Sequence, residues 1–399
     1  MLASEQDRVV TFDVPKAVTK SILTIDTFLG CDFTNSPASV NEYQSPNCVN
    51  LIRDVPGKVR KAMGYEVLET YEGKKINGFH TMHGENPIIH AGTSIYKNGV
   101  EIYSEANDHR SKSWQFEDKT VIVDGKQLLI YDGTTISPAS QNAYIPTLTI
   151  AKAPNGGGKE YEALNLIQPG FKELFAGTEN DKEYHLSFGG LDDTPIKVEV
   201  LDSNGAWQEK TLTTDYSVNR ETGVVTFETA PGVSPVTGED NVKITAYRTV
   251  EGYANKINKC TIGIQFGVNG ATDRLFLSGN PDFINYDWYS GLNDPTYFPD
   301  TGYAKLGSDR SAIVGYSIIS SLLAAHKDEE EEHQTVILRS GTLVDDKPAF
   351  RIMNTLQGAG AIAPYSFAYL SNEPLFLTRL GIYAITAQDV TGEKYAQNR

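Results

Sequence analysis

Cysteine is scarce in this sequence: Cys31, Cys48 and Cys260 are the only three in 399 residues, and they are widely spaced. A disulfide framework or a structural zinc site needs paired cysteines at short spacing. We therefore expect neither, and we expect a protein that is made and assembled in a reducing cytoplasm.

Long apolar runs are also missing. The first ten residues contain no basic segment followed by an apolar core, so we expect no signal peptide. The longest apolar patch, residues 312–325, is interrupted by three serines and is too short to cross a bilayer. We expect no membrane-spanning segment.

Motifs for common chemistries are absent: no G-x-S-x-G sequence, phosphate-binding loop or EF-hand loop occurs. His80 and His83 have the spacing of paired zinc ligands, but no cysteine or carboxylate completes the set nearby. The acidic run 328–333 fits a solvated loop better than a cation site. We expect no enzyme activity, no cofactor and no metal.

Positive charge is in deficit, with 35 basic against 51 acidic residues and a net charge of −16. An acidic surface repels phosphate backbones, which argues against ordinary binding of DNA or RNA. Solubility is the simpler explanation of this charge. A more specific explanation of the charge is a surface or channel that must not hold nucleic acid.

Aromatic residues and turn residues are abundant. The chain has 21 tyrosines, 16 phenylalanines and 35 glycines but only 4 methionines, a mixture that favours pleated, turn-rich structure. Asn98-Gly99 between apolar runs is a strong hairpin signal, and two Asp-Gly turns enclose the apolar run 127–131. A glycine followed by an aliphatic pair and a tyrosine recurs along the chain. Such repetition predicts an all-β fold with the irregular blades of a β-propeller, and a generic antiparallel β protein is the alternative.

The repetition is interrupted in the middle of the chain. The glycines at 156–158 indicate a linker, and residues 196–201 and 242–247 alternate between apolar and polar in the manner of a β-sandwich. We therefore predict five segments: an extended N-terminal arm (1–64), first propeller blades (65–155), a linker (156–180), an inserted Ig-like β-sandwich (181–250) and further blades (251–399).

Residues 308–327 have partial helical periodicity, with Ser308 as a possible cap. They are also rich in isoleucine, valine and tyrosine. One helix and two consecutive strands are both compatible with this pattern.

The arm contains a cluster of basic residues, namely Arg53, Lys58, Arg60 and Lys61, around the turn-forming pair Pro56-Gly57. In isolation this cluster would suggest a nucleic-acid patch. In an acidic chain we favour docking on an acidic neighbour, or neutralisation by the chain's own carboxylates.

Trp114, Trp288 and Tyr289 are candidate sugar-stacking or interface aromatics, and several carboxylates lie near the last two. Glycosidases need two carboxylates close to such rings. A carbohydrate-binding or carbohydrate-active propeller is therefore the alternative function. A Trp- and Tyr-rich loop is equally ordinary at a protein interface.

Residues 45–66, which include Ser45, Pro46, Asn50 and the basic cluster, resemble the opening of tail proteins from tailed bacteriophages. Residues 372–383, from Asn372 to Tyr383, resemble blades of the same proteins. The chain looks most like the nozzle, or stabilisation, proteins of short-tailed phages.

This resemblance implies a virion structural protein of the tail or neck, assembled in the host cytoplasm. It implies a ring of identical subunits, often six, below the portal and adaptor. The lumen would retain DNA and pass it at ejection, without sequence-specific binding. No catalytic residue is implied. Proteins of this family are often longer, which leaves the number of blades open.

Overall fold

The computed structural model describes residues 11–387 and 395–398. It is nearly all β, with 41% of residues in strands and 4% in helices, which confirms the predicted all-β class. The chain divides into two compact units, Met1–Thr70 and Tyr71–Arg399, called here the N-terminal unit and the main unit.

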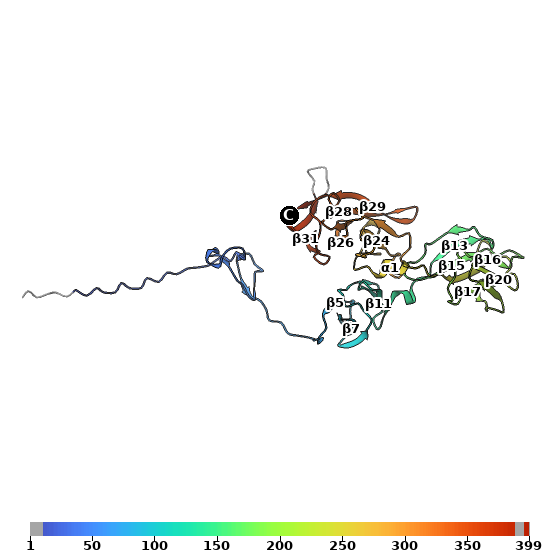
Figure 1. Ribbon diagram of the computed structural model, residues 1–399, viewed down its shortest axis with the longest axis horizontal. Helices are drawn as coiled ribbons and strands as arrows, with labels where there is room; N and C mark the ends of the chain where they lie inside the picture. The colour runs from blue at the N-terminus through green and yellow to red at the C-terminus, as the bar shows by residue number, and fades with distance from the viewer. Residues whose placement is uncertain (1–10, 388–394, 399) are drawn as a thin grey trace, which may run out of the picture. The chain divides into compact units, whose positions relative to one another are not determined.

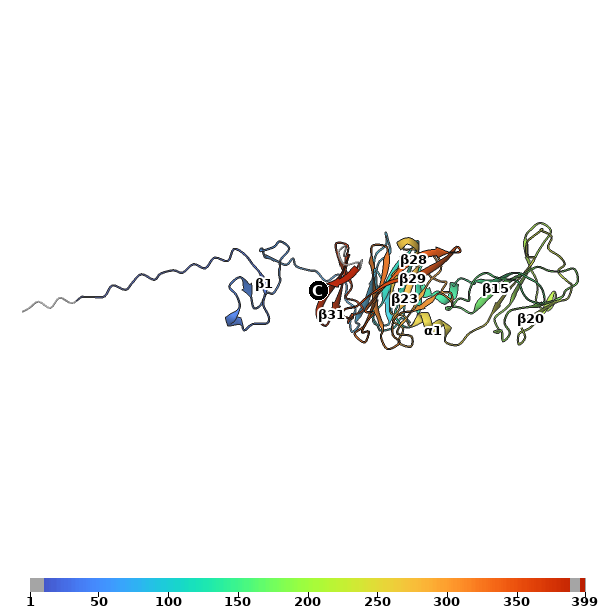
Figure 2. The ribbon, with the colours of Figure 1, turned by 90° about the horizontal axis from the view of Figure 1, so that it is seen from above.

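The N-terminal unit contains little regular structure. Residues 11–27 form an extended trace without helix or strand (Figure 2). Two small sheets and one 3-10 helix follow: β1 (Gly30–Cys31) paired with β2 (Gln44–Ser45), β3 (Leu51–Ile52) paired with β4 (Arg60–Lys61), and η1 (Pro37–Ser39).

Over its described residues, 11–70, the N-terminal unit has no core of its own. None of residues 11–70 is buried, and seventeen large apolar side chains among them are exposed. Folded chains are stabilised chiefly by burying such side chains. This unit therefore lacks the usual source of stability unless another surface covers it.

Five four-stranded antiparallel sheets form most of the main unit. In each, the strands lie in the order in which they occur in the chain. The sheets are A, with β5 (Ile76–His80), β6 (Ile88–Ala91), β7 (Ser94–Lys97) and β8 (Val100–Tyr103); B, with β9 (Lys112–Phe116), β10 (Lys119–Val123), β11 (Leu128–Tyr131) and β12 (Ile136–Pro138); C, with β22 (Ile262–Gln265), β23 (Leu275–Ser278), β24 (Tyr286–Tyr289) and β25 (Tyr303–Lys305); D, with β26 (Ile313–Ile319), β27 (Leu322–Lys327), β28 (Val336–Val344) and β29 (Lys347–Leu356); and E, with β30 (Ala368–Leu370), β31 (Glu373–Thr378), β32 (Gly381–Ala387) and β33 (Tyr395–Asn398).

Consecutive sheets pack face to face through separate hydrophobic clusters (Figure 1). Sheet B illustrates the arrangement. Ile122 and Leu129 contribute to the cluster with sheet A, whereas Val121 and Ile130 contribute to the cluster with sheet C. Because neighbouring residues on a strand point to opposite faces, a sheet buried on both faces needs a continuous apolar run. This requirement explains why all four residues of β11 are apolar or aromatic and buried.

Between sheets B and C the chain forms a separate module, residues 147–247. Phe175 and Ile244 of its larger sheet pack with Tyr184 and Phe227 of its smaller sheet in one core. The larger sheet has the order β14 (Lys159–Glu160), β13 (Thr147–Lys152), β15 (Gly170–Phe175), β21 (Val242–Tyr247), β17 (Lys197–Leu201) and β18 (Trp207–Glu209). The smaller has the order β16 (Glu183–His185), β20 (Val224–Phe227) and β19 (Tyr216–Asn219).

The module differs from the predicted boundaries. The segment 156–180, expected to be a linker, contains β14 and β15, and β15 is a central strand of the larger sheet. The module therefore begins at β13 and not at residue 181. The glycines at 156–158 all have positive φ, as expected of a turn.

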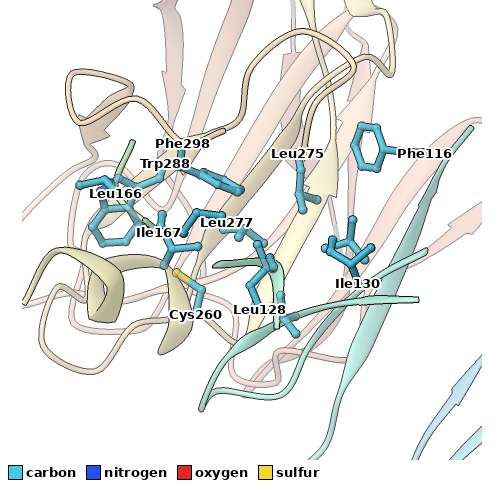
Figure 3. Close-up of a cluster of buried hydrophobic side chains, with 14 residues drawn as sticks. Phe116, Leu128, Ile130, Leu166, Ile167, Cys260, Leu275, Leu277, Trp288 and Phe298 are labelled. Carbon is cyan, nitrogen blue, oxygen red and sulfur yellow. The ribbon is translucent and has the colours of Figure 1, made fainter. Parts of the chain in front are cut away.

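A short strap within the module, residues 164–168, inserts into the cluster between sheets B and C. Leu166 and Ile167 are each 2% exposed there, beside Trp288 and Phe298 (Figure 3). The strap is also tied by hydrogen bonds: the Leu166 amide donates to the Phe298 carbonyl at 2.8 Å, and the Asn165 side chain donates to two further carbonyls.

Residues 308–327 form β26 and β27 rather than one helix. Ser320, with φ of 55°, lies in the turn between them. Both strands are almost entirely buried, which accounts for apolar residues on every side of the segment. The α-helix of the described part is the short α1 (Tyr253–Asn258), which precedes sheet C, and the remaining 3-10 helices are η2 (Ala139–Asn142) and η3 (Val268–Gly270).

Candidate functional site

The basic residues of the arm lie on one small hairpin. Pro56 and Gly57 form its turn: Gly57 has φ of 78°, and the Lys58 amide donates to the Val55 carbonyl at 3.1 Å. This geometry is a tight turn in which proline sets one dihedral and glycine supplies the positive φ. Strand β4 supplies Arg60 to the same hairpin.

All four basic side chains of this hairpin are exposed: Arg53, Lys58, Arg60 and Lys61. Arg60 donates to the Asp54 carboxylate at 2.5 Å, and this hydrogen bond lowers the pKa of Asp54. Both side chains are about half exposed, so this ion pair adds little to stability. One of the four charges is thus neutralised within the arm.

The predicted aromatic cluster is divided between two cores. Trp288 is 2% exposed and lies in the cluster between sheets B and C (Figure 3). Its ring packs against Phe283 and Tyr286. A buried ring offers no face to a sugar, so the proposal that Trp288 stacks on a glycan is corrected. Trp114 is half-buried against the same cluster.

Tyr289 faces the other way. It follows Trp288 on β24, so its ring points to the opposite face of sheet C, where it packs on Phe276 and Phe350 with ring centres 5.5 and 4.8 Å away. The alternation of side chains along a strand makes it impossible for Trp288 and Tyr289 to grip one ligand together. Tyr289 is half-buried, and burial raises the pKa of its hydroxyl.

Tyr289 does line a groove of about 680 Å³ between the module and sheets C and D. Tyr161, Phe188 and Tyr297 also line it, together with Glu162 and Asp300. This groove was not predictable from the sequence, because its two walls come from segments more than eighty residues apart. Neither wall carries a recognisable motif.

The carboxylates near Trp288 are engaged in ion pairs. The N to O distances are 2.5 Å for Asp287 with Arg339, 2.6 Å for Asp282 with Lys259 and 2.8 Å for Asp273 with Arg274. Asp287 and Arg339 are buried, at 0% and 2% side-chain exposure, and join sheet C to sheet D. A pair of free carboxylates flanking a sugar site is therefore not formed by these residues.

The two carboxyl groups that line the groove, those of Glu162 and Asp300, have different environments. Glu162 accepts from the Thr147 amide at 2.6 Å and from the Tyr144 hydroxyl at 2.9 Å. Burial and this carboxylate raise the pKa of Tyr144 to about 12. Burial also raises the pKa of Asp300. The groove thus combines aromatic faces with one engaged and one partly desolvated carboxyl group.

His80 and His83 do not converge. His80 is buried and its two ring nitrogens lie 3.0 and 2.9 Å from the hydroxyls of Ser113 and Ser111, whereas His83 is exposed. Within residues 11–387 and 395–398, no group of three or more His, Cys, Asp and Glu side chains is arranged to hold a metal ion.

The acidic run is more than a solvated loop. Asp328 accepts from the Ala312 amide at 2.8 Å, Glu331 accepts from the Ser308 amide at 2.9 Å, and Glu329 pairs with Arg379 at 2.5 Å. These carboxylates satisfy backbone donors around sheet D. In the part of the chain that the structure describes, no helix has the length and hydrophobicity required to cross a membrane.

No protein-family model and no curated protein matches this chain. Among solved structures, one similar chain is Kluyveromyces lactis Hsv2, at 12% sequence identity and a TM-score of 0.21, covering 82% of this chain and 98% of that chain. At this TM-score the likeness supports no conclusion about fold or function.

Proposed function

We propose that this chain is a structural protein of a bacteriophage tail or neck, and that it forms an oligomeric ring with a lumen through which DNA passes. The observation that carries the proposal is the described part of the N-terminal unit, residues 11–70, which exposes seventeen large apolar side chains and buries none. A segment of this kind is stable in an assembly that covers it. An assembly part is therefore a better fit than a protein that works alone.

We interpret the main unit as an irregular β-propeller. Five successive four-stranded sheets, joined pairwise by hydrophobic clusters, support this interpretation. A contact between the last sheet and an early one also supports it. The ring of Tyr365, just before sheet E, lies 4.6 Å from the Arg110 guanidinium and 4.8 Å from the ammonium of Lys112, at the start of sheet B. The module between sheets B and C is interpreted as an inserted Ig-like sandwich.

The charge distribution fits a conduit. Residues 71–399 contain 42 acidic and 28 basic residues, whereas residues 51–65 contain four basic residues and one acidic residue. An acidic main unit repels passing DNA instead of holding it. The basic hairpin is suited to acidic protein neighbours, for which a portal, an adaptor and a second copy of this chain are the candidates.

Native mass spectrometry with negative-stain imaging tests the proposal, with the protein alone and with a portal–adaptor complex. We expect closed rings, alone or on that complex. A monomer that ignores the complex at every concentration would refute a ring-forming conduit. Reversing the charge at Arg53, Lys58 and Lys61 should weaken binding to the complex, whereas Lys210→Glu in the module serves as the control.

The groove beside Tyr289 favours one second candidate, a carbohydrate-binding protein. Its aromatic faces and carboxyl groups match the chemistry of saccharide sites. A glycan array tests this candidate. Binding that is lost in Tyr161→Ala and Tyr289→Ala would support it, and an array without any bound glycan would remove it.

A further inference from the structure

Residues 11–26 are extended and have no strand partner in the described structure. Phe12, Val14, Val18 and Ile22 all occupy even positions, so in an extended chain they lie on one face. Their exposed fractions are between 85% and 91%. Across residues 11–27, no backbone group has a hydrogen-bond partner in the described structure. Such a segment gains both backbone bonds and apolar burial when it is added to a sheet edge.

Strand β29 offers an edge of matching length. The last strands of sheets A, B, C and E, namely β8, β12, β25 and β33, have three or four described residues each, whereas β29, the last strand of sheet D, has ten. β29 pairs with β28 on one side only. Proteins usually keep edge strands short because a long edge invites pairing with another chain. β29 is the longest edge strand among the sheets of the described residues.

The middle of β29 is also apolar and open. Ile352 is 50% exposed and Met353 is 62% exposed, and Met353 is the extra residue of a bulge at which the register with β28 shifts. Ten residues of strand span roughly 33 Å. The sixteen residues at 11–26 reach about 50 Å when extended, which is enough to cover all of β29 and leave slack for the connection.

Charge indicates which edge partner fits. β29 contains Lys347 and Arg351 and no acidic residue, so two copies of β29 placed side by side would bring like charges together. Residues 11–26 contain two acidic residues, Asp13 and Asp26, and two basic residues, Lys16 and Lys20, so the segment carries no net charge that would repel β29. The segment is therefore a better partner for β29 than β29 itself.

We propose that residues 11–26 of one copy pair with β29 of a second copy as a fifth strand of its sheet D. This inference rests on the proposed ring function and names the contact that links its subunits. Each copy then offers one segment and one edge at different places on its surface. Such a head-to-tail contact closes into a ring when the rotation between copies allows it.

Full-length variants test the proposal. The segment variant carries Val14→Asp and Val18→Asp, the edge variant carries Ile352→Asp and Met353→Asp, and the control carries Leu212→Asp and Val233→Asp in the module, where both residues are exposed. We expect each of the first two variants to lower the association constant by at least about a hundredfold, because two apolar contacts are lost. The control should assemble as the unaltered chain does.

Mixing the segment variant with the edge variant gives the decisive result. The mixture retains one intact segment and one intact edge, so native mass spectrometry should show dimers and no rings. Hydrogen exchange on the unaltered assembly should show protected amides at residues 11–26, and this protection should be lost in the edge variant. That second readout holds even if the edge variant folds poorly, because the protection is first measured on the unaltered chain.

Other outcomes separate the two proposals. Rings that persist in the segment variant would overturn the strand contact and leave the ring function standing. Two monomeric variants that give no dimers on mixing would also overturn it. A chain that never self-associates would overturn both proposals.

Discussion

Replacing Arg339 with methionine should weaken the junction between sheets C and D. Arg339 donates to Asp287 at 2.5 Å, and both side chains are almost fully buried. Arg339 also donates twice to the Phe350 carbonyl at 3.3 Å, while the Tyr316 hydroxyl donates to the same carboxylate at 3.4 Å. The guanidinium is therefore the main compensation for a carboxylate removed from water.

The size of the effect follows from that burial. Removing one partner of a buried ion pair leaves an uncompensated charge and typically costs about 3–5 kcal/mol of unfolding free energy. Replacing both charged residues with apolar residues of similar volume often leaves the unfolding free energy nearly unchanged. We therefore expect Arg339→Met to cost about 3–5 kcal/mol, and the double variant Asp287→Leu with Arg339→Met to recover most of that loss.

The matched control is the exposed pair of Lys259 and Asp282, which has a similar distance of 2.6 Å but side chains that are 39% and 54% exposed. Solvent screens such pairs, so Lys259→Met should cost at most about 1 kcal/mol. The two substitutions remove the same number of charges. The difference between their losses of unfolding free energy therefore measures the effect of burying the ion pair.

Urea denaturation of the full chain is the appropriate assay, because guanidinium salts would screen the charges under study. The unfolding transition of sheets C and D is followed for the unaltered chain, Arg339→Met, the double variant and Lys259→Met. A loss below about 1 kcal/mol in Arg339→Met would refute the reasoning. So would a double variant that is as unstable as the single one, since the cost would then come from lost packing and not from the stranded carboxylate.

Three further predictions follow from buried or paired groups. Trp288→Ala should lower the unfolding free energy by about 3–5 kcal/mol through the cavity it leaves, and thermal denaturation should show this loss without any change in glycan binding. Burial lowers the pKa of His80 and of His326 to about 3, below the 6.5 of an unfolded chain. The unfolded state therefore binds more protons as pH falls below 6.5, and stability should decrease by about 2 kcal/mol per histidine at pH 5; urea midpoints that are unchanged between pH 7 and pH 5 would contradict this. Cys31 is exposed, Cys48 is partly exposed, and the two thiols are close enough for a hydrogen bond that raises the pKa of Cys31. Because oxidants reach these two thiols and not buried Cys260, oxidation should join Cys31 to Cys48 while Cys260 stays reduced, as peptide mapping would reveal.

Turn chemistry made much of the fold predictable from sequence. Asn98-Gly99 separates β7 from β8, and Asp124-Gly125 lies between β10 and β11. The boundary of the module was harder to predict. β15 lies among glycines, a proline and charged residues, and its partner β21 is some seventy residues away in sequence. Pairing over that distance leaves no local signal.

The candidate site was less predictable than the fold. Alternation along β24 already implies that Trp288 and Tyr289 face opposite ways, but it does not say which face is covered. Both faces are covered, because sheets B and D pack on either side of sheet C. The exposure of the arm was foreseeable only in part: its basic residues stand out in the sequence, whereas its lack of any core emerges from the burial of each residue.

The strap at residues 164–168 limits how this protein can change over time. A module attached only by its two ends can be exchanged between genes or trimmed by an engineer without harm to its host. Here Leu166 and Ile167 belong to the module by chain order and to the main unit by packing. Joining residue 145 directly to residue 249 would remove two side chains from a core that otherwise remains. Module and host are thus bound to evolve together, and a graft that succeeds must carry the strap with it.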